Sequence, residues 1–262
     1  MEKKQQAGKR PSLRDNPKCP CGDFPWMGYY WKRKISKIKF EENYWGKVVD
    51  PDGISRNLSE ERDQKIKDQK SIITFVNDLP PGSILDIGCG PGFTLSVING
   101  KWEKYGLDIS KYASNIAKKY CRVFTGLLAD ANYQSNFFDV VLLNQVLEFV
   151  DDPLLYVNEA KRVLKAGGYM IVASINFDSG CARLFGSNYR ILKNPGYQNL
   201  FTDLSMMKLL EDINLKIEKI EYPFFQTRWF TKENLLRLFD KNKTSPPFYG
   251  NVFEIYAFKL LE

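Results

Sequence analysis

A chain of 262 residues with 44% apolar side chains can build the core of one domain with additions. It shows neither an apolar run near the roughly 18 residues of a membrane span nor a signal-peptide core, so we expect a soluble, cytoplasmic protein. The formal net charge is +7, and the chain contains no histidine, which excludes Ser-His-Asp and Cys-His catalysis and an imidazole general base.

Residues 1–56 are predicted to form a basic arm and an aromatic lid, ahead of a larger unit at 57–262. The first 40 residues contain 11 Lys or Arg and 3 Asp or Glu, so the arm carries the basic character of the chain. Aromatic and basic side chains interleave at Phe24, Trp26, Tyr29, Tyr30, Trp31, Lys32, Arg33 and Lys34. This mixture suits RNA or an anionic membrane surface, and equally a tail with a lid that packs on the domain.

The cysteine pattern predicts no metal site. Cys19-Pro20-Cys21 has the spacing of half a zinc knuckle, but no second cysteine pair lies nearby. The chain has five cysteines, an odd number, and no secretion signal precedes them, so we expect reduced thiols.

Residues 57–80 are predicted to form a capped helix. The most informative stretch follows it, an apolar strand that ends in glycines at alternate positions. The strand begins at Ile84, and the glycines are Gly88, Gly90 and Gly92. Such a strand ahead of a helix is typical of nucleotide sites in doubly wound α/β folds. The dinucleotide fingerprint needs a glycine where this chain has Phe93, and Asp86 would repel a pyrophosphate. We therefore expect a ligand that is cationic near the glycines.

Three further strands are predicted after this turn. The second, over 104–109, ends in Asp108, about twenty residues on, where dinucleotide folds place an acid that binds ribose hydroxyls. Ser110 then caps a helix. The third strand, over 121–126, precedes a loop with Leu128, Ala129 and Asp130. The apolar run at 137–143 predicts a central parallel strand, and Asn144 follows it.

These motifs, in this order, resemble the class I S-adenosylmethionine-dependent methyltransferases, most strongly over 81–174. The resemblance implies S-adenosylmethionine as cofactor and an α/β fold with a doubly wound, mostly parallel seven-stranded sheet whose last strand is antiparallel. It places Asp86 near the methionine amino group and the glycines around the cofactor. The residues implied in cofactor binding are Asp86, Gly88, Cys89, Gly90, Gly92, Asp108, Ile109, Leu128, Ala129, Asp130 and Asn144.

The remaining elements follow the same pattern. A helix from about 153 to 164 stops at Gly167-Gly168, and a fifth strand covers 169–174. Residues 175–202, which we expect to be loop-like because of Gly180, Gly186 and Pro195, correspond to an acceptor-side insert. Residues 203–262 are predicted to close the sheet with a helix, strands at 216–222 and 252–260, and a helix at 232–239 between them.

The absent histidines limit what can be said of catalysis. Many relatives carry His where this chain has Phe149 and Tyr197. Methyl transfer depends mainly on alignment, because the sulfonium is already a strong electrophile. The available base candidates are Glu148, Asp151, Tyr189 and Tyr197, each of which also fits a structural or binding role, so the catalytic residues remain unassigned.

We therefore expect a methyltransferase that acts on a small molecule, a sugar or a lipid-linked glycan precursor. The acceptor class rests on a further resemblance, of residues 176–186 and 245–251, to bacterial enzymes related to ubiquinone-type and polysaccharide-modifying methyltransferases. One alternative is an RNA or protein methyltransferase that uses the basic arm. Another is a non-catalytic S-adenosylmethionine-binding module, and a dinucleotide oxidoreductase is disfavoured by Asp86 and Phe93.

Overall fold

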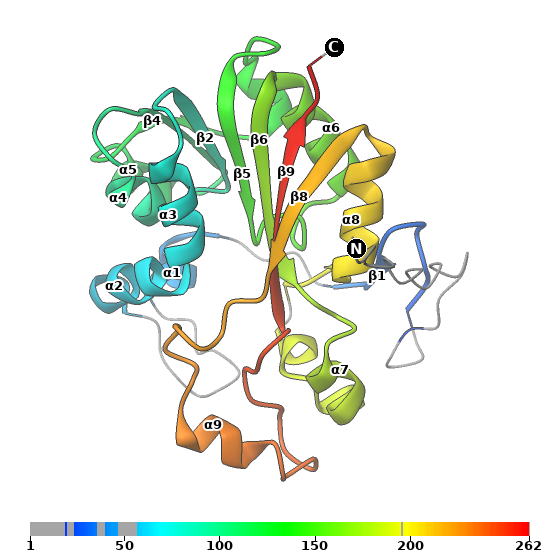
Figure 1. Cartoon of the computed structure of the whole chain (residues 1–262). Helices are drawn as coiled ribbons and strands as arrows, with labels where there is room; N and C mark the ends of the chain where they lie inside the picture. Colours follow the sequence, from blue (N-terminus) through cyan, green and yellow to red (C-terminus); the bar gives the residue numbers. More distant parts are fainter. Residues whose placement is uncertain (1–18, 20–23, 36–39, 47–56, 195, 262) are drawn as a thin grey trace, which may run out of the picture.

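The computed structural model describes residues 19, 24–35, 40–46, 57–194 and 196–261, and its centre is a seven-stranded sheet (Figure 1). The strand order is β4-β3-β2-β5-β6-β9-β8. The strands are β2 (Ser83–Ile87), β3 (Glu103–Asp108), β4 (Arg122–Thr125), β5 (Phe138–Asn144), β6 (Leu164–Ile175), β8 (Leu215–Glu221) and β9 (Val252–Lys259). The five neighbouring strands β4, β3, β2, β5 and β6 pair in parallel, whereas β9 is antiparallel to both β6 and β8. The predicted mostly parallel sheet with an antiparallel last strand is confirmed.

Alternating side chains of the central strands bury against helices on both faces of the sheet. Ile84 and Val140 pack with α3 (Lys70–Asp78) and α4 (Phe93–Val97), whereas Leu85 and Val141 pack with α6 (Pro153–Val163) and α8 (Asp203–Asp212). Figure 1 shows α3, α4 and α5 (Lys111–Ala117) on one side of the sheet and α6 and α8 on the other. The double burial explains why these strands are apolar throughout.

The single helix expected over 57–80 is two helices, α2 (Leu58–Asp68) and α3, separated at Gln69. The backbone of Gln69 leaves the helical region (φ −106°, ψ 19°), and its buried amide oxygen accepts a hydrogen bond from Thr94. The two helices differ in burial, because α3 packs Ile72 and Val76 into the core while α2 turns toward the carboxyl edge of the sheet.

The insert at 175–202 is more ordered than the expected loop. It contains α7 (Gly180–Phe185), the 3-10 turns η2 (Gly186–Asn188) and η3 (Arg190–Lys193), and the short strand β7 (Asn199–Leu200). The Ser179 hydroxyl caps α7 by accepting from the Ala182 N–H at 3.1 Å, and Cys181 and Phe185 are buried. Glycine at 186 ends the helix in a positive-φ conformation instead of preventing it.

The aromatic part of the arm packs on this insert. β1 (Trp31–Lys32) pairs with β7, and the Trp31 ring lies 5.5 Å from that of Phe177. Tyr30 and Trp31 are 7% and 3% exposed. Residues 1–18 and Cys21 lie outside the described residues, and so does most of the predicted basic tail. Within the described part of the chain, no helix is long and apolar enough to cross a lipid bilayer.

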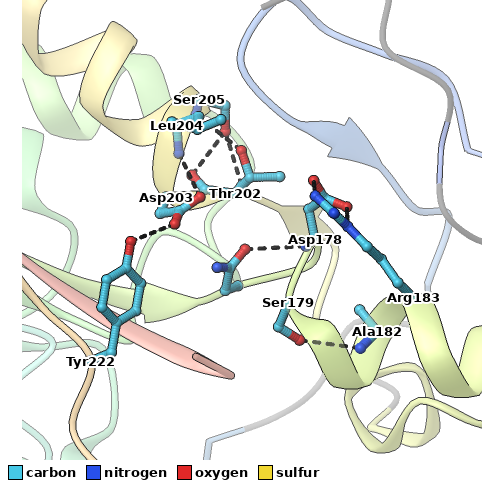
Figure 2. A network of polar contacts seen from close by, with 10 residues as sticks. Asp178, Ser179, Ala182, Arg183, Thr202, Asp203, Leu204, Ser205 and Tyr222 are labelled. Atoms are coloured by element: carbon cyan, nitrogen blue, oxygen red, sulfur yellow. Dashed lines mark hydrogen bonds and ion pairs between the residues drawn. The ribbon is translucent and has the colours of Figure 1, made fainter. Parts of the chain in front are cut away.

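A polar network fixes the start of α8 beside the insert (Figure 2). The Thr202 hydroxyl accepts from the Ser205 N–H at 3.0 Å, and the Ser205 hydroxyl accepts from the Thr202 N–H at 2.9 Å, which together form a capping box. Asp203 accepts a hydrogen bond from the Tyr222 hydroxyl at 2.6 Å. The network therefore ties α8 to the segment that follows β8.

We expect Thr202→Ala to lower the free energy of unfolding by about 1 kcal/mol, because it leaves the Ser205 N–H without its capping oxygen. Thr202→Ser keeps the hydroxyl and should retain most of the stability. Urea denaturation of the two variants and the wild type measures the difference. Equal stabilities for the Ala and Ser variants would contradict the capping role.

Candidate functional site

A cavity of about 770 Å³ opens at the carboxyl ends of β2, β5 and β6. Its wall combines the glycine turn after β2, the segment after β5, the insert at 175–202 and the connection at 222–251 between β8 and β9. α1 (Glu42–Gly46) and α2 complete it. Figure 1 shows α7 and α9 (Lys232–Arg237) beyond this edge of the sheet, opposite the strand ends.

The turn after β2 requires glycine at two positions that face other groups closely. Gly88 and Gly90 have φ values of +71° and +53°. A Cβ at Gly88 would lie 2.2 Å from Cγ2 of Val146, and one at Gly90 would lie 2.7 Å from the Trp45 ring. Gly92, also with positive φ, starts α4 against Ala117. The backbone can therefore line the cavity only because these side chains are absent.

Asp108 holds the turn in place. Its Oδ2 accepts from the Gly90 N–H and its Oδ1 from the Ser110 N–H, both at 2.8 Å. Burial raises the pKa of this carboxyl, while the two N–H donors lower it. Asp108 joins β3 to the turn and also lies on the cavity wall. The sequence analysis did not predict the contact of Asp108 with the turn, and its role with the ribose hydroxyls stays a prediction.

Asp86, predicted beside the methionine amino group, is 3% exposed and lies behind the cavity wall. Burial raises its pKa to about 7, with Lys65 acting to lower it and Asp108 to raise it. Lys65, from α2, lines the cavity. The charges near the turn thus form a coupled set of two carboxyls and one ammonium.

Apolar side chains cover the side of the cavity next to Asp108. Ile109, Leu127 and Leu155 are 49%, 51% and 54% exposed and all lie on its wall. Leu128 is instead buried in the core, and Ala129 and Asp130 in the turn η1 (Leu128–Ala131) are off the wall. Leu127 therefore lines the cavity in place of the predicted Leu128, Ala129 and Asp130.

Cys89 supports the turn from behind. The residue is 4% exposed, its sulfur lies beside Gly106, and its N–H donates to the Leu107 carbonyl at 3.0 Å. Neither group faces the cavity. Asn144, at the end of β5, does line it, as does the neighbouring Gln145, which has a φ of +54°.

The base candidates separate into buried and cavity-lining residues. Glu148 is buried, and its Oε1 accepts from the Ser174 hydroxyl at 2.7 Å and the Ile175 N–H at 3.1 Å. Tyr189 is buried as well and donates to the Asn176 carbonyl at 3.1 Å. Neither lies on the wall.

Tyr197 and Asp151 do lie on the wall, and the Tyr197 ring is 4.9 Å from that of Phe149. Phe149 and Tyr197, the two positions that the sequence analysis singled out for their lack of histidine, are therefore adjacent in space and form an aromatic pair.

Sequence reasoning missed the wall contributed by residues 222–251. Arg228 forms an ion pair with Asp68 of α2, with Nε and Oδ2 3.3 Å apart, and its guanidinium lies 4.2 Å from the centre of the Trp229 ring. Trp229, Phe224 and Glu254 face the same cavity. The length of this connection and its aromatic content were the signals that could have indicated a segment covering the cavity, which we call the cap.

A family model described as "Methyltransferase domain" matches residues 58–220, more than half of the chain. An uncharacterized protein of Methanocaldococcus jannaschii is 32% identical over 149 residues, which are 56% of this chain and 71% of that protein. The ubiquinone biosynthesis O-methyltransferase of Cereibacter sphaeroides is 34% identical over 104 residues, 36% of this chain and 41% of the relative. The chain thus matches less than half the length of that enzyme.

Solved structures show the same fold at low sequence identity. A SAM-dependent methyltransferase from Archaeoglobus fulgidus aligns with a TM-score of 0.58 at 17% identity, covering 76% of this chain and 94% of that one. The geranyl diphosphate C-methyltransferase of Streptomyces coelicolor, crystallised with S-adenosyl-L-homocysteine, aligns with a TM-score of 0.53 at 14% identity, covering 73% and 77%. With the family match and the glycine turn, these findings show that the chain belongs to the class I S-adenosylmethionine-dependent methyltransferases.

Proposed function

We propose that the enzyme methylates a small-molecule acceptor, a class that includes sugars and lipid-linked glycan precursors. The observation that carries this proposal is one cavity that extends from the glycine turn to a group of aromatic side chains. These are Phe149, Tyr197, Phe224 and Trp229. A volume of about 770 Å³ is in the range of small-molecule sites.

The cofactor half of the cavity fits S-adenosylmethionine. We assign the close backbone approach to Gly88 and Gly90, the ribose hydroxyls to Asp108, and the adenine to the apolar wall of Ile109 and Leu127. Asp86, Cys89, Gly92 and residues 128–130 support these groups from behind, and Asn144 borders the reacting end. The bound cofactor supplies an electrophilic methyl group on a sulfonium.

The acceptor half is aromatic. Phe149, Tyr197, Phe224 and Trp229 line it, and the Phe40 ring meets Phe149 edge-on at 5.6 Å. Aromatic faces bind apolar groups and the C–H faces of sugar rings, and they exclude water from the reacting atoms. We therefore propose that these aromatic side chains both bind the acceptor and exclude water from the site.

Packing of the arm favours a small acceptor over RNA. Tyr30 and Trp31 are buried against the insert and β7, so their rings are not available to stack on bases. The basic residues of the first 18 positions lie outside the described residues.

We expect Gly88→Ala to weaken S-adenosylhomocysteine binding by more than about tenfold, since a left-handed conformation costs an L-residue roughly 1–2 kcal/mol and the new Cβ meets Val146. Gly100→Ala is the matched control, because a Cβ there has no atom within 4 Å. Isothermal titration calorimetry measures both affinities. Normal binding by the Gly88 variant would exclude the turn as the cofactor site.

Deletion of residues 1–22 should give the same turnover number as the full chain at each ionic strength. The reason is that the proposed acceptor contacts the cavity and not the tail. Turnover measured across a salt series tests this expectation. A loss of activity that depends steeply on salt would contradict it, since that dependence marks a polyanionic acceptor.

A further inference from the structure

We propose that Glu254 is the general base of this methyltransferase and takes the proton from an acceptor hydroxyl. This inference rests on the proposed function. Glu254 lies on β9, is 2% exposed, and borders the cavity. It was not among the base candidates that the sequence suggested.

The sheet register places Glu254 on the acceptor side of the strand ends. Asn144 of β5 pairs with Ala173 of β6, which pairs in turn with Glu254. Adjacent strands are about 4.8 Å apart, so the Glu254 backbone is roughly 10 Å across the sheet from Asn144. Figure 1 shows β9 between β6 and β8, on the side of β5 away from β2 and its glycine turn.

Hydrogen bonds fix one oxygen of this carboxyl and leave the other for a ligand. Oε2 accepts from the Ser71 hydroxyl of α3 and from the Tyr256 hydroxyl at 2.9 Å. Among the described residues, no donor contacts Oε1. A carboxylate anchored in this way has a defined orientation toward a proton that it accepts.

The surroundings set the basicity in a useful range. Burial raises the pKa of Glu254 to about 7, while the Ser71 and Tyr256 hydroxyls lower it. On β8, Glu221 acts to raise the pKa and Lys219 to lower it, and β6 presents the uncharged Ala173. A base with a pKa near neutrality is deprotonated in a useful fraction and still accepts a proton readily.

Other acidic groups at the wall already have partners. Asp68 is paired with Arg228, Asp108 is bonded to the glycine turn, and Asp152 caps α6 by accepting from the Leu154 and Leu155 N–H groups. Phe149 and Tyr197 form an aromatic pair, and a chain without histidine provides no imidazole. Asp151 of the wall also takes part in another interaction, so we assign the role of base to Glu254, a buried and anchored carboxyl that borders the acceptor half.

The proposed step is a direct displacement. The acceptor oxygen forms a bond to the methyl carbon, and the carbon–sulfur bond breaks with its electron pair remaining on sulfur. The Glu254 carboxylate receives the hydroxyl proton and releases it to solvent after the products leave. A hydroxyl needs such a base because the neutral group is a weak nucleophile.

The first test needs no acceptor. Carbon-13 NMR of glutamate carboxyls, compared between the wild type and Glu254→Gln, identifies the resonance of Glu254 and its titration midpoint. The proposal predicts a midpoint near 7, moved upward in Ser71→Ala because a donor to the charged form is lost. A midpoint near the ordinary value of 4.5 would overturn the proposal.

The second test measures transfer of labelled methyl from S-adenosylmethionine to the low-molecular-mass and glycolipid fractions of a cell extract. Glu254→Gln should lower the rate by about 100-fold or more and abolish the rise in rate with pH through about 7, with S-adenosylhomocysteine affinity unchanged. Glu218→Gln, which removes an exposed carboxylate of β8 that does not line the cavity, should retain the wild-type rate.

The outcomes separate the two claims. Transfer by the wild type that persists at an equal rate and pH dependence in Glu254→Gln overturns the base and leaves the proposed function standing. Absence of transfer by the wild type to both the low-molecular-mass and the glycolipid fractions contradicts the proposed function, and the base assignment falls with it. Preserved S-adenosylhomocysteine binding shows that Glu254→Gln has folded.

Discussion

The buried Asp108 carboxylate is the contact on which the site depends. It accepts the Gly90 N–H and the Ser110 N–H at once, so it joins the glycine turn after β2 to the helix that follows β3. Hydrogen bonds to charged groups contribute about 1.5–3 kcal/mol, more than neutral ones. Since three of the turn residues are glycines without a side chain to pack, this clamp helps to define the shape of the turn. The shape of the turn therefore depends on two neighbouring strands and not on the glycines alone.

The acceptor half of the cavity is formed by two connections between strands of the sheet. The connection at 222–251 lies against α2 through the Arg228–Asp68 pair, and the insert at 175–202 is held by β1 and β7. Aromatic rings fill the space between them, including the Phe149 and Tyr197 pair. The chain has no histidine, so the cavity contains no imidazole. A buried carboxyl such as Glu254 can then act as base, because burial brings its pKa close to neutrality.

The sequence predicted the strands of the sheet and the glycine turn because the information there is local. Apolar runs, glycine spacing and the distance to Asp108 are all visible within short windows. Leu127 was missed by one position, since the exposure of neighbouring leucines depends on the phase of a single 3-10 turn. Glu254 was missed for another reason. In the sequence it is one acid in an alternating strand, and its burial arises from β6 and from Ser71, a residue 183 positions earlier. The same long range explains why the cap at 222–251 was not predicted.

The central claim is that one cavity holds the cofactor and a small acceptor. The most direct measurement incubates the purified protein with methyl-labelled S-adenosylmethionine and a whole cell extract, then separates small molecules, glycolipids, RNA and protein. The account predicts label in the small-molecule or glycolipid fraction. Label confined to RNA or protein would contradict it, because those acceptors would have to act through the arm and not through the aromatic half of the cavity.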